Sequence, residues 1–433
     1  MIGEIFPRKP RSMRVNSSLC LSLLLMFAAV TSTSGADWPQ WLGPLRNGTT
    51  SEIVVPWEKD PSVVWRQELV AGYSSPIVAE GAVLVHSTVA KKNEEQVLAF
   101  DALTGKELWR DSYSRDAFRS MFGSGPRTTP SVADGKLYTY GITGILSCYD
   151  VKSGKRLWQT NPYETLKGSM PRFGVCSSPV IVDGRVIVMV GGGGSAVAAY
   201  DTTTGELAWK AFDEPASSAS PIVMIRGDGD DKQADIVVQT TLRVMGLSPK
   251  DGSVRWEHPM VFQPAGVSPT PLIVGKSLIC TTQDTGTLAL DFSEKGTTKP
   301  KSPWWQQDAS SYFSTGTTGP NDTVLVVTNL LQPLPRTDVT CFDLTKGDQL
   351  WKQERLGYYH VGLITTGDGK LLMLDDAGNL ILAEVTREGF KQLSKSHICR
   401  GTLANPALAN GHVVVRDDKE IVCVRLTPAS VEK

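Results

Sequence analysis

The sequence is organised around a short unit that recurs along most of its length. In its clearest copy, residues 98–109, apolar residues alternate up to Asp101, and Gly105 and Trp109 follow. Alternation at a period of two predicts a half-buried strand, and Asp followed by Gly predicts a tight turn. The unit therefore predicts a strand, a turn and a second strand that carries Trp109.

Four further copies keep the Gly and the Trp, and a looser copy has Ala289-Leu290-Asp291 followed by Trp304 and Trp305. The chain also has a Trp strand at Trp65. Successive Trp residues, counted through Trp305, lie 44 to 51 residues apart, a period typical of propeller blades with four short strands each. The structural residues of the other repeats are Asp150, Gly154, Trp158, Asp201, Gly205, Trp209, Gly252, Trp256, Asp343, Gly347 and Trp351.

Most blades are expected to begin with Ser or Thr before Pro. The last blade lacks its own Trp strand, whereas the segment around Trp65 has such a strand without a blade. Pairing the two would remove an exposed sheet edge. The sequence thus predicts an all-β, eight-bladed β-propeller of four-stranded antiparallel blades, closed by the N-terminal strand. The expected blade starts are Ser75-Pro76, Thr129-Pro130, Ser178-Pro179, Ser220-Pro221, Thr270-Pro271, the neighbourhoods of Gly319-Pro320 and Leu363, and Asn405-Pro406.

The first residues resemble a secretory signal. A basic start precedes a short apolar run, and small residues near Ala36 suit cleavage; Met1 and Met13 are both candidate starts. We expect a signal peptide over 1–36, a segment over 37–60 that packs on the propeller, the propeller over 61–428, and a tail over 429–433. The mature protein is then periplasmic or secreted, with no transmembrane span.

The net charge of −1 gives no indication of a nucleic-acid partner. Six cysteines remain after cleavage, and they could pair in an oxidising compartment. However, Cys148, Cys341 and Cys423 occupy one repeat slot, where other copies have Ala or Gly. We interpret this slot as a tight site for a small side chain that faces a Trp, in which Cys acts as a small hydrophobe.

The Asp-x-x-Thr-Gly-x-x-x-Trp pattern, the opening Trp38-Pro39-Gln40-Trp41-Leu42-Gly43-Pro44 and the run Gly72-Tyr73-Ser74-Ser75-Pro76 resemble a known family. It comprises the PQQ-like, BamB-like repeat propellers related to quinoproteins, including exported proteins of the planctomycete type. The resemblance implies a ligand funnel lined by the starts of the innermost strands. The candidate ligand-binding residues there are Tyr73, Arg127, Arg172, Cys176, Tyr358, His360 and Arg400, with Phe173 and Tyr312 beside them.

The resemblance leaves two main functions open. One is a non-catalytic scaffold that docks envelope proteins, glycans or a polar ligand, and a purely structural repeat in a surface assembly is a variant of it. The other is a PQQ-dependent alcohol or polyol dehydrogenase, which the family builds with adjacent cysteines and with Ca²⁺ on Glu, Asn and Asp. No cysteines are adjacent here, and Asn405 and Glu384 are isolated candidate ligands. We therefore predict no catalytic residue, metal site or cofactor.

The run Asp228-Gly229-Asp230-Asp231 is the most metal-like stretch of the sequence. Alternating carboxylates can bind Ca²⁺, but no Glu follows at the spacing of a calcium loop. We interpret the run as a solvated hairpin of the fourth blade.

Overall fold

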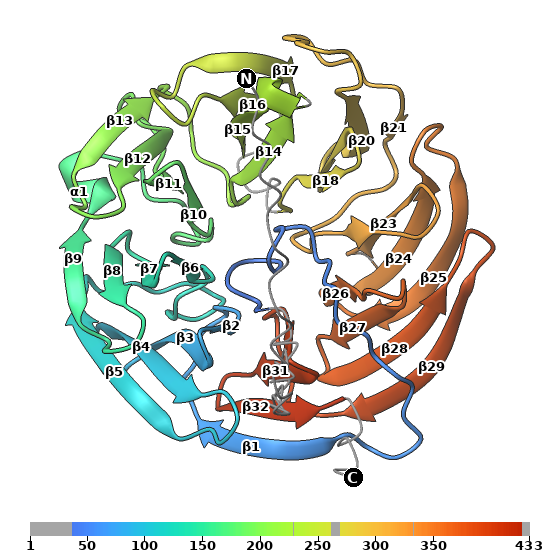
Figure 1. Cartoon of the computed structure of the whole chain (residues 1–433), viewed down its shortest axis with the longest axis horizontal. Coiled ribbons are helices and arrows are strands. Elements are labelled where there is room, and N and C mark those ends of the chain that lie inside the picture. Colours follow the sequence, from blue (N-terminus) through green and yellow to red (C-terminus); the bar gives the residue numbers. More distant parts are fainter. Residues whose placement is uncertain (1–36, 228, 261–268, 332, 427–433) are drawn as a thin grey trace, which may run out of the picture. The chain divides into compact units, whose positions relative to one another are not determined.

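The computed structural model describes residues 37–227, 229–260, 269–331 and 333–426. They form eight four-stranded antiparallel sheets arranged as blades around a central axis (Figure 1). This confirms the predicted eight-bladed propeller. The expected signal peptide and C-terminal tail lie outside the described residues.

Blades one to four follow one another along the chain. Blade one comprises β2 (Ile77–Ala79), β3 (Ala82–Thr88), β4 (Glu94–Asp101) and β5 (Glu107–Ser114). Blade two comprises β6 (Ser131–Ala133), β7 (Lys136–Tyr140), β8 (Leu146–Asp150) and β9 (Arg156–Thr160), and helix α1 (Pro162–Thr165) follows it. Blade three comprises β10 (Val180–Val182), β11 (Arg185–Met189), β12 (Val197–Asp201) and β13 (Leu207–Ala211). Blade four comprises β14 (Ile222–Arg226), a 3₁₀ turn (Gly229–Asp231), β15 (Gln233–Gln239), β16 (Arg243–Leu247) and β17 (Val254–Pro259).

Blades five to eight complete the ring. Blade five comprises β18 (Leu272–Val274), β19 (Ser277–Thr282), β20 (Gly286–Asp291) and β21 (Trp305–Gln306). Blade six comprises β22 (Thr317–Thr318), β23 (Thr323–Leu330), β24 (Arg336–Asp343) and β25 (Gln349–Gly357). Blade seven comprises β26 (Val361–Thr365), β27 (Leu371–Asp375), β28 (Asn379–Val385) and β29 (Phe390–His397). Blade eight comprises β30 (Ala407–Ala409), β31 (His412–Arg416), β32 (Glu420–Arg425) and β1 (Ser62–Glu68).

The ring closes as the sequence predicts. Strand β1 pairs antiparallel with β32, and Trp65 lies opposite Cys423. Both ends of the propeller therefore lie in one blade, where β1 covers the edge that β32 would otherwise expose.

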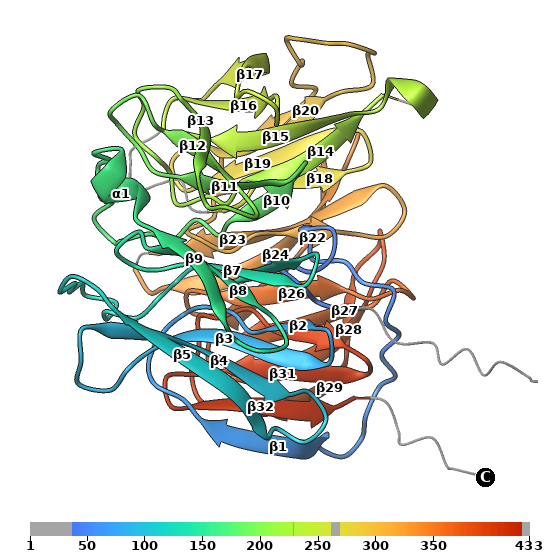
Figure 2. The same cartoon turned by 60° about the vertical axis from the view of Figure 1, so that its left-hand side comes forward.

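The antiparallel order gives the propeller two distinct faces. We call the face that carries the loops from each blade to the next the upper face; it also carries the loops between second and third strands. The lower face carries the remaining turns. In Figure 2 the upper face lies to the left, with α1, and the β14–β15 hairpin extends to the right.

The repeated Trp joins each blade to its neighbour. The indole of Trp158 in blade two lies against Gly205 in the β12–β13 turn of blade three, and its Nε1 donates to the carbonyl of Thr202 at 3.2 Å. The same donation runs from Trp65 to Ala102, from Trp109 to Val151 and from Trp209 to Pro249. A buried indole thus keeps a partner for its N–H while its ring packs between blades.

Each turn is held by the Asp that precedes it. Oδ1 of Asp101 accepts hydrogen bonds from the backbone N–H groups of Leu103 and Thr104, and the bonds from Thr104 lower the pKa of Asp101. The Gly that follows adopts a positive φ, +70° at Gly105 and +72° at Gly205. In each repeat the Asp therefore caps the turn, the Gly supplies the positive φ that the turn needs, and the Trp makes the contact between blades.

The structure gives the exact positions for two sequence predictions about the repeat. Trp304, not Trp305, is the docking residue of blade five: Trp304 lies against Gly347 and donates to Leu344 at 2.8 Å, whereas Trp305 is half exposed. Blade six begins before Gly319-Pro320, because β22 ends at Thr318 and the Gly-Pro pair lies in the following turn.

Blade four also departs from the pattern. Nε1 of Trp256 donates to Asp235 of its own blade, and its ring packs edge-on against Phe292 of blade five, with ring centroids 4.7 Å apart. Blade five has a Lys/Thr-rich insert in place of the usual Gly turn. An aromatic contact therefore replaces the usual bond to the turn.

The small-residue slot has the predicted neighbour. Cys148, Cys341 and Cys423 lie directly across from the Trp of the same blade's outer strand, and all six described cysteines are free thiols. A Cβ added at Gly246, in the same slot, would collide with the indole of Trp256. The slot is small because the indole fills the space opposite it.

The Ser or Thr before Pro links the blades near the axis. The backbone N–H of Ser178 donates to Ser220 Oγ at 2.9 Å, and that of Thr270 donates to Thr315 Oγ1 at 2.9 Å. Similar bonds run from Thr129 to Ser178, from Ser220 to Thr270 and from Asn405 to Ser75. These bonds explain why blade starts favour a hydroxyl side chain.

The segment 37–57 enters the central channel from the lower face and then runs outward along that face (Figures 1 and 2). Trp38 forms a bridge with Val78 of β2, and the Arg46 guanidinium donates to the carbonyls of Ser178 and Pro179. On the lower face, the Glu52 carboxylate accepts from the backbone N–H groups of 410 and 411 in the β30–β31 turn. The segment thus contacts the innermost strands of several blades.

The segment ends with Trp57, which supplies a Trp to the outer strand of blade seven. Nε1 of Trp57 donates to Ser396 Oγ at 2.8 Å, and its backbone exchanges two bonds with Ser394. Both serines belong to β29, the outer strand of a blade that has no Trp of its own.

Two glycines of blade three test the inter-blade contact. Gly205→Ala would place a Cβ 2.6 Å from Cδ2 of Trp158, whereas Gly184→Ala at φ +69° would meet no atom within 4 Å. Both substitutions place Ala at a similar positive φ and so introduce similar backbone strain. The difference between their losses in stability therefore reports the contact with Trp158. We expect Gly205→Ala to lower the free energy of unfolding by about 1–3 kcal/mol more than Gly184→Ala in urea titrations. Equal losses would contradict the docking account.

Candidate ligand-binding site

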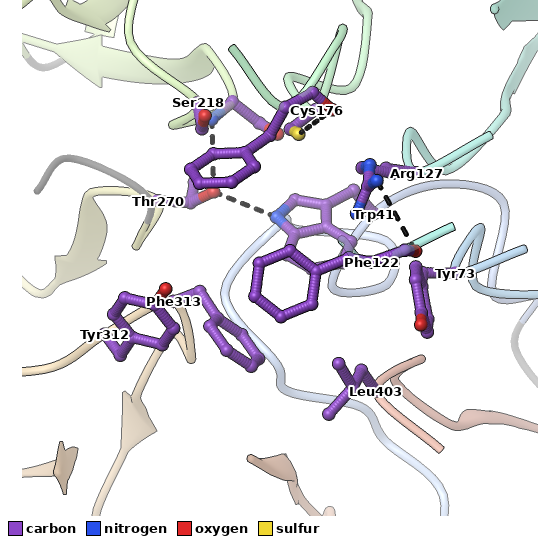
Figure 3. A pocket seen from close by; sticks show the side chains of 12 residues that line it. Trp41, Tyr73, Phe122, Arg127, Cys176, Ser218, Thr270, Tyr312, Phe313 and Leu403 are labelled. Atoms are coloured by element: carbon purple, nitrogen blue, oxygen red, sulfur yellow. Dashed lines mark hydrogen bonds between the residues drawn. The ribbon is translucent and has the colours of Figure 1, made fainter. Parts of the chain in front are cut away.

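A cavity of about 160 Å³ opens at the centre of the upper face (Figure 3). We call it the central cavity. Its walls are mostly aromatic, with one guanidinium, one thiol and a few hydroxyl groups. The lining residues are Trp41, Tyr73, Phe122, Arg127, Phe173, Cys176, Ser218, Ser220, Thr270, Tyr312, Phe313 and Leu403.

Trp41 comes from the channel segment, not from a blade. Its Nε1 donates to Oγ1 of Thr270 at 3.0 Å, and that hydroxyl also accepts the N–H of Ser220. The indole is thereby fixed among the other aromatic side chains of the cavity, as Figure 3 shows. Because the segment enters along the channel, Trp41 meets the cavity from below.

Arg127 provides the positive charge of the central cavity. Its guanidinium lies 5.5 Å from the ring centroid of Tyr73 and 6.0 Å from that of Phe122, distances suited to cation–π contact. One nitrogen donates to Ser120 Oγ at 2.7 Å and to the carbonyl of Gly123 at 3.1 Å. Among the described residues no carboxylate pairs with Arg127, and its buried Nε has no acceptor.

A buried network supports the loop that carries Phe122 and Arg127. The Glu95 carboxylate accepts from Tyr113 at 2.6 Å and from the N–H of Ile142 at 3.0 Å, and His86 lies 3.4 Å away. Burial alone would raise the pKa of Glu95, but these hydrogen bonds and the nearby imidazole lower it. Arg115, 3.4 Å from Glu95, donates onward to carbonyls of the loop at 116 and 124.

A second cavity of about 420 Å³ adjoins the first on the upper face. We call it the acidic cavity. It shares Tyr73 and Leu403 with the central cavity, and its other lining residues come from blades seven and eight and from the loop before β2. They are Gly72, Tyr358, Tyr359, Asp376, Arg400, Gly401, Thr402, Asp417 and Asp418.

His360 lies beneath this face and lines neither cavity. Its Nδ1 is 2.7 Å from Ser314 Oγ, and its ring stacks on Phe313 with centroids 5.6 Å apart. Burial lowers the pKa of His360 to about 4, against the opposing effect of Asp376. The imidazole is therefore neutral at neutral pH and acts as packing behind a cavity wall.

The structure brings the predicted funnel residues together only in part. Tyr73, Arg127 and Cys176 meet in the central cavity, and Tyr358 and Arg400 meet Tyr73 in the acidic cavity. Arg172 lines neither cavity; it is exposed and lies 5.6 Å from the ring centroid of Phe173. A ligand role for these residues stays a prediction.

Cys176 contributes a neutral thiol to the wall. Its Sγ lies 3.5 Å from the carbonyl of Gly174, and burial raises its pKa, with Arg127 opposing the change. A protonated thiol is a poor nucleophile, so this position suits packing against a ligand.

Sequence reasoning missed Trp41, Phe122 and Phe313 as wall residues. Phe122 and Phe313 lie in the loops before innermost strands, the same region that pointed to Arg127 and Tyr312. Trp41 lies in the Trp-Pro-Gln-Trp motif, but its bond to Thr270 spans 229 residues. No local pattern indicates that contact.

Comparison with known proteins places this propeller among its relatives. A family model described as "Outer membrane protein assembly factor BamB" matches residues 47–120 and 93–353, well over half of the chain. The chain belongs to this BamB-type family. The outer membrane protein assembly factor BamB of Yersinia pestis is 24% identical over 370 residues, covering 81% of this chain and 86% of the relative.

Quinoprotein enzymes are also similar to this BamB-type chain. The quinohemoprotein alcohol dehydrogenase of Comamonas testosteroni is 26% identical over 207 residues, covering 45% of this chain and 28% of that enzyme. The aligned regions span about a fifth to a third of the curated dehydrogenases.

Solved structures show the shared fold. BamB of Moraxella catarrhalis has a TM-score of 0.60 at 15% identity, covering 84% of this chain and all of that one. The crystal structure of the Comamonas testosteroni dehydrogenase has a TM-score of 0.68 at 15% identity, covering 92% of this chain and 82% of the enzyme chain.

The described lining of the central cavity can be compared with the ligands that Ca²⁺ beside PQQ would need. Ca²⁺ takes six to eight oxygen ligands, commonly from carboxylates. The described lining of the central cavity contains no carboxylate or carboxamide. Over the described ranges, no group of three His, Cys, Asp or Glu side chains is placed to hold a metal ion.

The helices of the described chain are too short or too polar to cross a membrane. Helix α1 has four residues.

The buried imidazole of His360 should make the stability of the protein depend on pH. An unfolded His has a pKa near 6.5, above the value of about 4 for folded His360, so the unfolded state binds the proton more readily between these values. The contribution of His360 to stability is therefore complete above about pH 6.5 and is lost as the pH falls toward 4. Urea titrations at pH 7.5 and 4.5 should show a larger loss for the native protein than for His360→Gln. Equal losses in both proteins would contradict a buried, neutral His360.

Proposed function

We propose that this protein is a non-catalytic binding propeller of the cell envelope that docks an envelope protein or a polar ligand on its upper face. The central cavity carries this proposal. It offers aromatic surface, hydroxyl groups and one guanidinium without a carboxylate partner, and Trp41 meets it from below. Such a mixture of apolar walls and few polar groups is typical of ligand sites.

The chemistry of the site favours binding over catalysis. The thiol of Cys176 has a raised pKa, and His360 is buried away from the cavity with its imidazole bonded to Ser314. A general acid or base needs to reach the reacting group. The described cavity lining offers cation–π, stacking and hydrogen-bond contacts in place of such a group.

The relatives support an envelope role. The Yersinia pestis protein, named as an outer membrane protein assembly factor, aligns with this chain over most of both lengths. The upper face also carries exposed apolar side chains, including Met121 in the β5–β6 loop and Leu334 in the β23–β24 loop. Exposed apolar groups of this kind suit a protein partner. A periplasmic or secreted location follows from the same proposal.

The alternative is a PQQ-dependent alcohol or polyol dehydrogenase, which the similarity to quinohemoprotein enzymes favours. That similarity covers about a quarter of the enzyme's length in the Comamonas case. Equilibrium dialysis with PQQ and Ca²⁺ separates the two functions. Retention of one equivalent of quinone would overturn the binding-only proposal.

Site-specific photo-crosslinking tests the upper face. A photoreactive residue replaces Met121, which is 80% exposed on the upper face, or Leu103, which is 67% exposed in the β4–β5 turn of the lower face. In envelope fractions, we expect a discrete covalent adduct from position 121 and none from position 103. Equal adducts at both positions, or none at 121, would contradict docking on the upper face.

A further inference from the structure

We infer that the central and acidic cavities together form one docking trough for a peptide segment in which a large apolar side chain lies beside a Lys or Arg. The apolar side chain fills the central cavity, and the cation enters the acidic cavity. This inference rests on the proposed docking function and names the chemistry of the partner.

The central cavity fits one ring-sized apolar group. Its volume is about 160 Å³, and an apolar protein cavity of about 150 Å³ is known to accept benzene. The rings of Trp41, Phe122, Phe173 and Phe313 line it, so an aromatic side chain would find both face and edge contacts.

The acidic cavity has an excess of negative charge. Its lining includes Asp376, Asp417 and Asp418 against the cation Arg400, and the buried guanidinium of Arg416 behind Asp417 offsets part of that charge. Over the described residues, none of the three carboxylates forms an ion pair with a side chain. A Lys or Arg from a partner would balance this charge.

Backbone donors fix two of these carboxylates in place. Asp376 accepts from the N–H groups of Tyr358, at 3.0 Å, and Tyr359, at 2.6 Å. Asp417 accepts from the N–H of Arg400 at 3.0 Å and from those of residues 419 and 420. The negative charges are therefore preorganised, which limits the ordering cost of binding.

Tyrosines provide a second and independent feature that suits a cation. Tyr358 is 64% exposed and Tyr359 is 45% exposed, although both lie at the cavity where their rings could be covered. Tyrosine faces attract ammonium and guanidinium groups. The combination of exposed rings and unpaired carboxylates thus favours a cationic side chain over a neutral group.

The two cavities lie side by side, because Tyr73 and Leu403 line both of them. A peptide that runs between the two cavities can place adjacent side chains in both of them, since successive side chains point to opposite sides of a strand. A neutral sugar could stack in the central cavity and donate hydrogen bonds to the carboxylates, but it would not neutralise their charge. The charge pattern therefore favours a peptide over a neutral glycan.

Binding of capped model peptides tests this inference. The probe is acetyl-Gly-Ser-Phe-Lys-Ser-Gly-amide, compared with versions in which Lys is replaced by Glu or Phe by Ala. In isothermal titration with the full chain, we expect each replacement to weaken binding by about tenfold or more, because it removes a charge pair or a buried ring. The affinity of the Phe-Lys peptide should fall with rising salt.

Substitutions in the acidic cavity test whether the Lys of the peptide binds there. Asp418 is exposed and makes no side-chain bond within the described structure, so Asp418→Asn should fold normally. We expect it to weaken the Phe-Lys peptide about two- to fivefold and the Phe-Glu peptide not at all. The matched control is Asp348→Asn, which removes the same charge from an exposed lower-face turn and should leave both affinities unchanged. Tyr358→Ala should also weaken the Phe-Lys peptide, while thermal unfolding verifies that each variant is folded.

The outcomes separate this inference from the proposed function. Equal affinity for the Lys and Glu peptides, or no binding of any peptide while the adduct at position 121 persists, would overturn the inference and leave upper-face docking intact. Binding of a neutral cello-oligosaccharide in place of the peptides would overturn it in favour of a glycan. Loss of the crosslink at position 121 as well would contradict the docking function itself.

Discussion

The structure depends on one repeated contact, the packing of a Trp from one blade against the Gly turn of the next. The indole of Trp158 packs on Gly205 and bonds to the Thr202 carbonyl, and the same arrangement recurs around most of the ring. The backbone ladders of each blade run only within its own sheet, so side-chain contacts such as this one fix the blades relative to one another. This one contact accounts for three recurring features: the small-residue slot, the glycine with a positive φ and the shape of the turn.

The Trp contacts lie at the outer strands, so other parts of the chain make the contacts near the axis. Hydroxyl side chains at the blade starts bond to neighbouring blades, and the segment 37–57 runs through the channel and contacts several innermost strands. With the channel occupied from the lower side, the central and acidic cavities open on the upper face, while a further cavity lies between the lower-face turns of blades four and five. The central and acidic cavities both contain residues from loops that carry no part of the Trp repeat, so the binding surface can vary without disturbing the contact between blades.

The sequence predicts the fold closely because the repeat signal is local. Asp101, Gly105 and Trp109 lie within one strand–turn–strand unit, and the missing Trp strand of the last blade points directly to Trp65. Blade five is harder: Trp304 and Trp305 are adjacent, and only packing against Gly347 identifies the docking residue. Gly319-Pro320 marks the start of blade six only approximately, since a Gly-Pro pair suits a turn as well as a blade start.

The site is less predictable because its contacts are non-local. Residues at the starts of the innermost strands are expected near the axis, and Tyr73, Arg127, Tyr358 and Arg400 lie there. That expectation cannot separate two cavities, and it cannot show that His360 is buried behind Phe313. Trp41 reaches the cavity only through the path of the channel segment. Burial and long-range packing, which the sequence does not encode at any fixed spacing, decide these outcomes.

The central claim is that the channel is occupied from below, so the central cavity opens only to the upper face. Hydrogen–deuterium exchange of the full chain tests it directly, because the backbone N–H groups of Trp38, Gly48 and Thr50 donate to carbonyls within the folded structure. The account predicts that peptides covering 38–50 exchange as slowly as those covering β2 and β26. Exchange of this segment at the rate of an unstructured chain would contradict it.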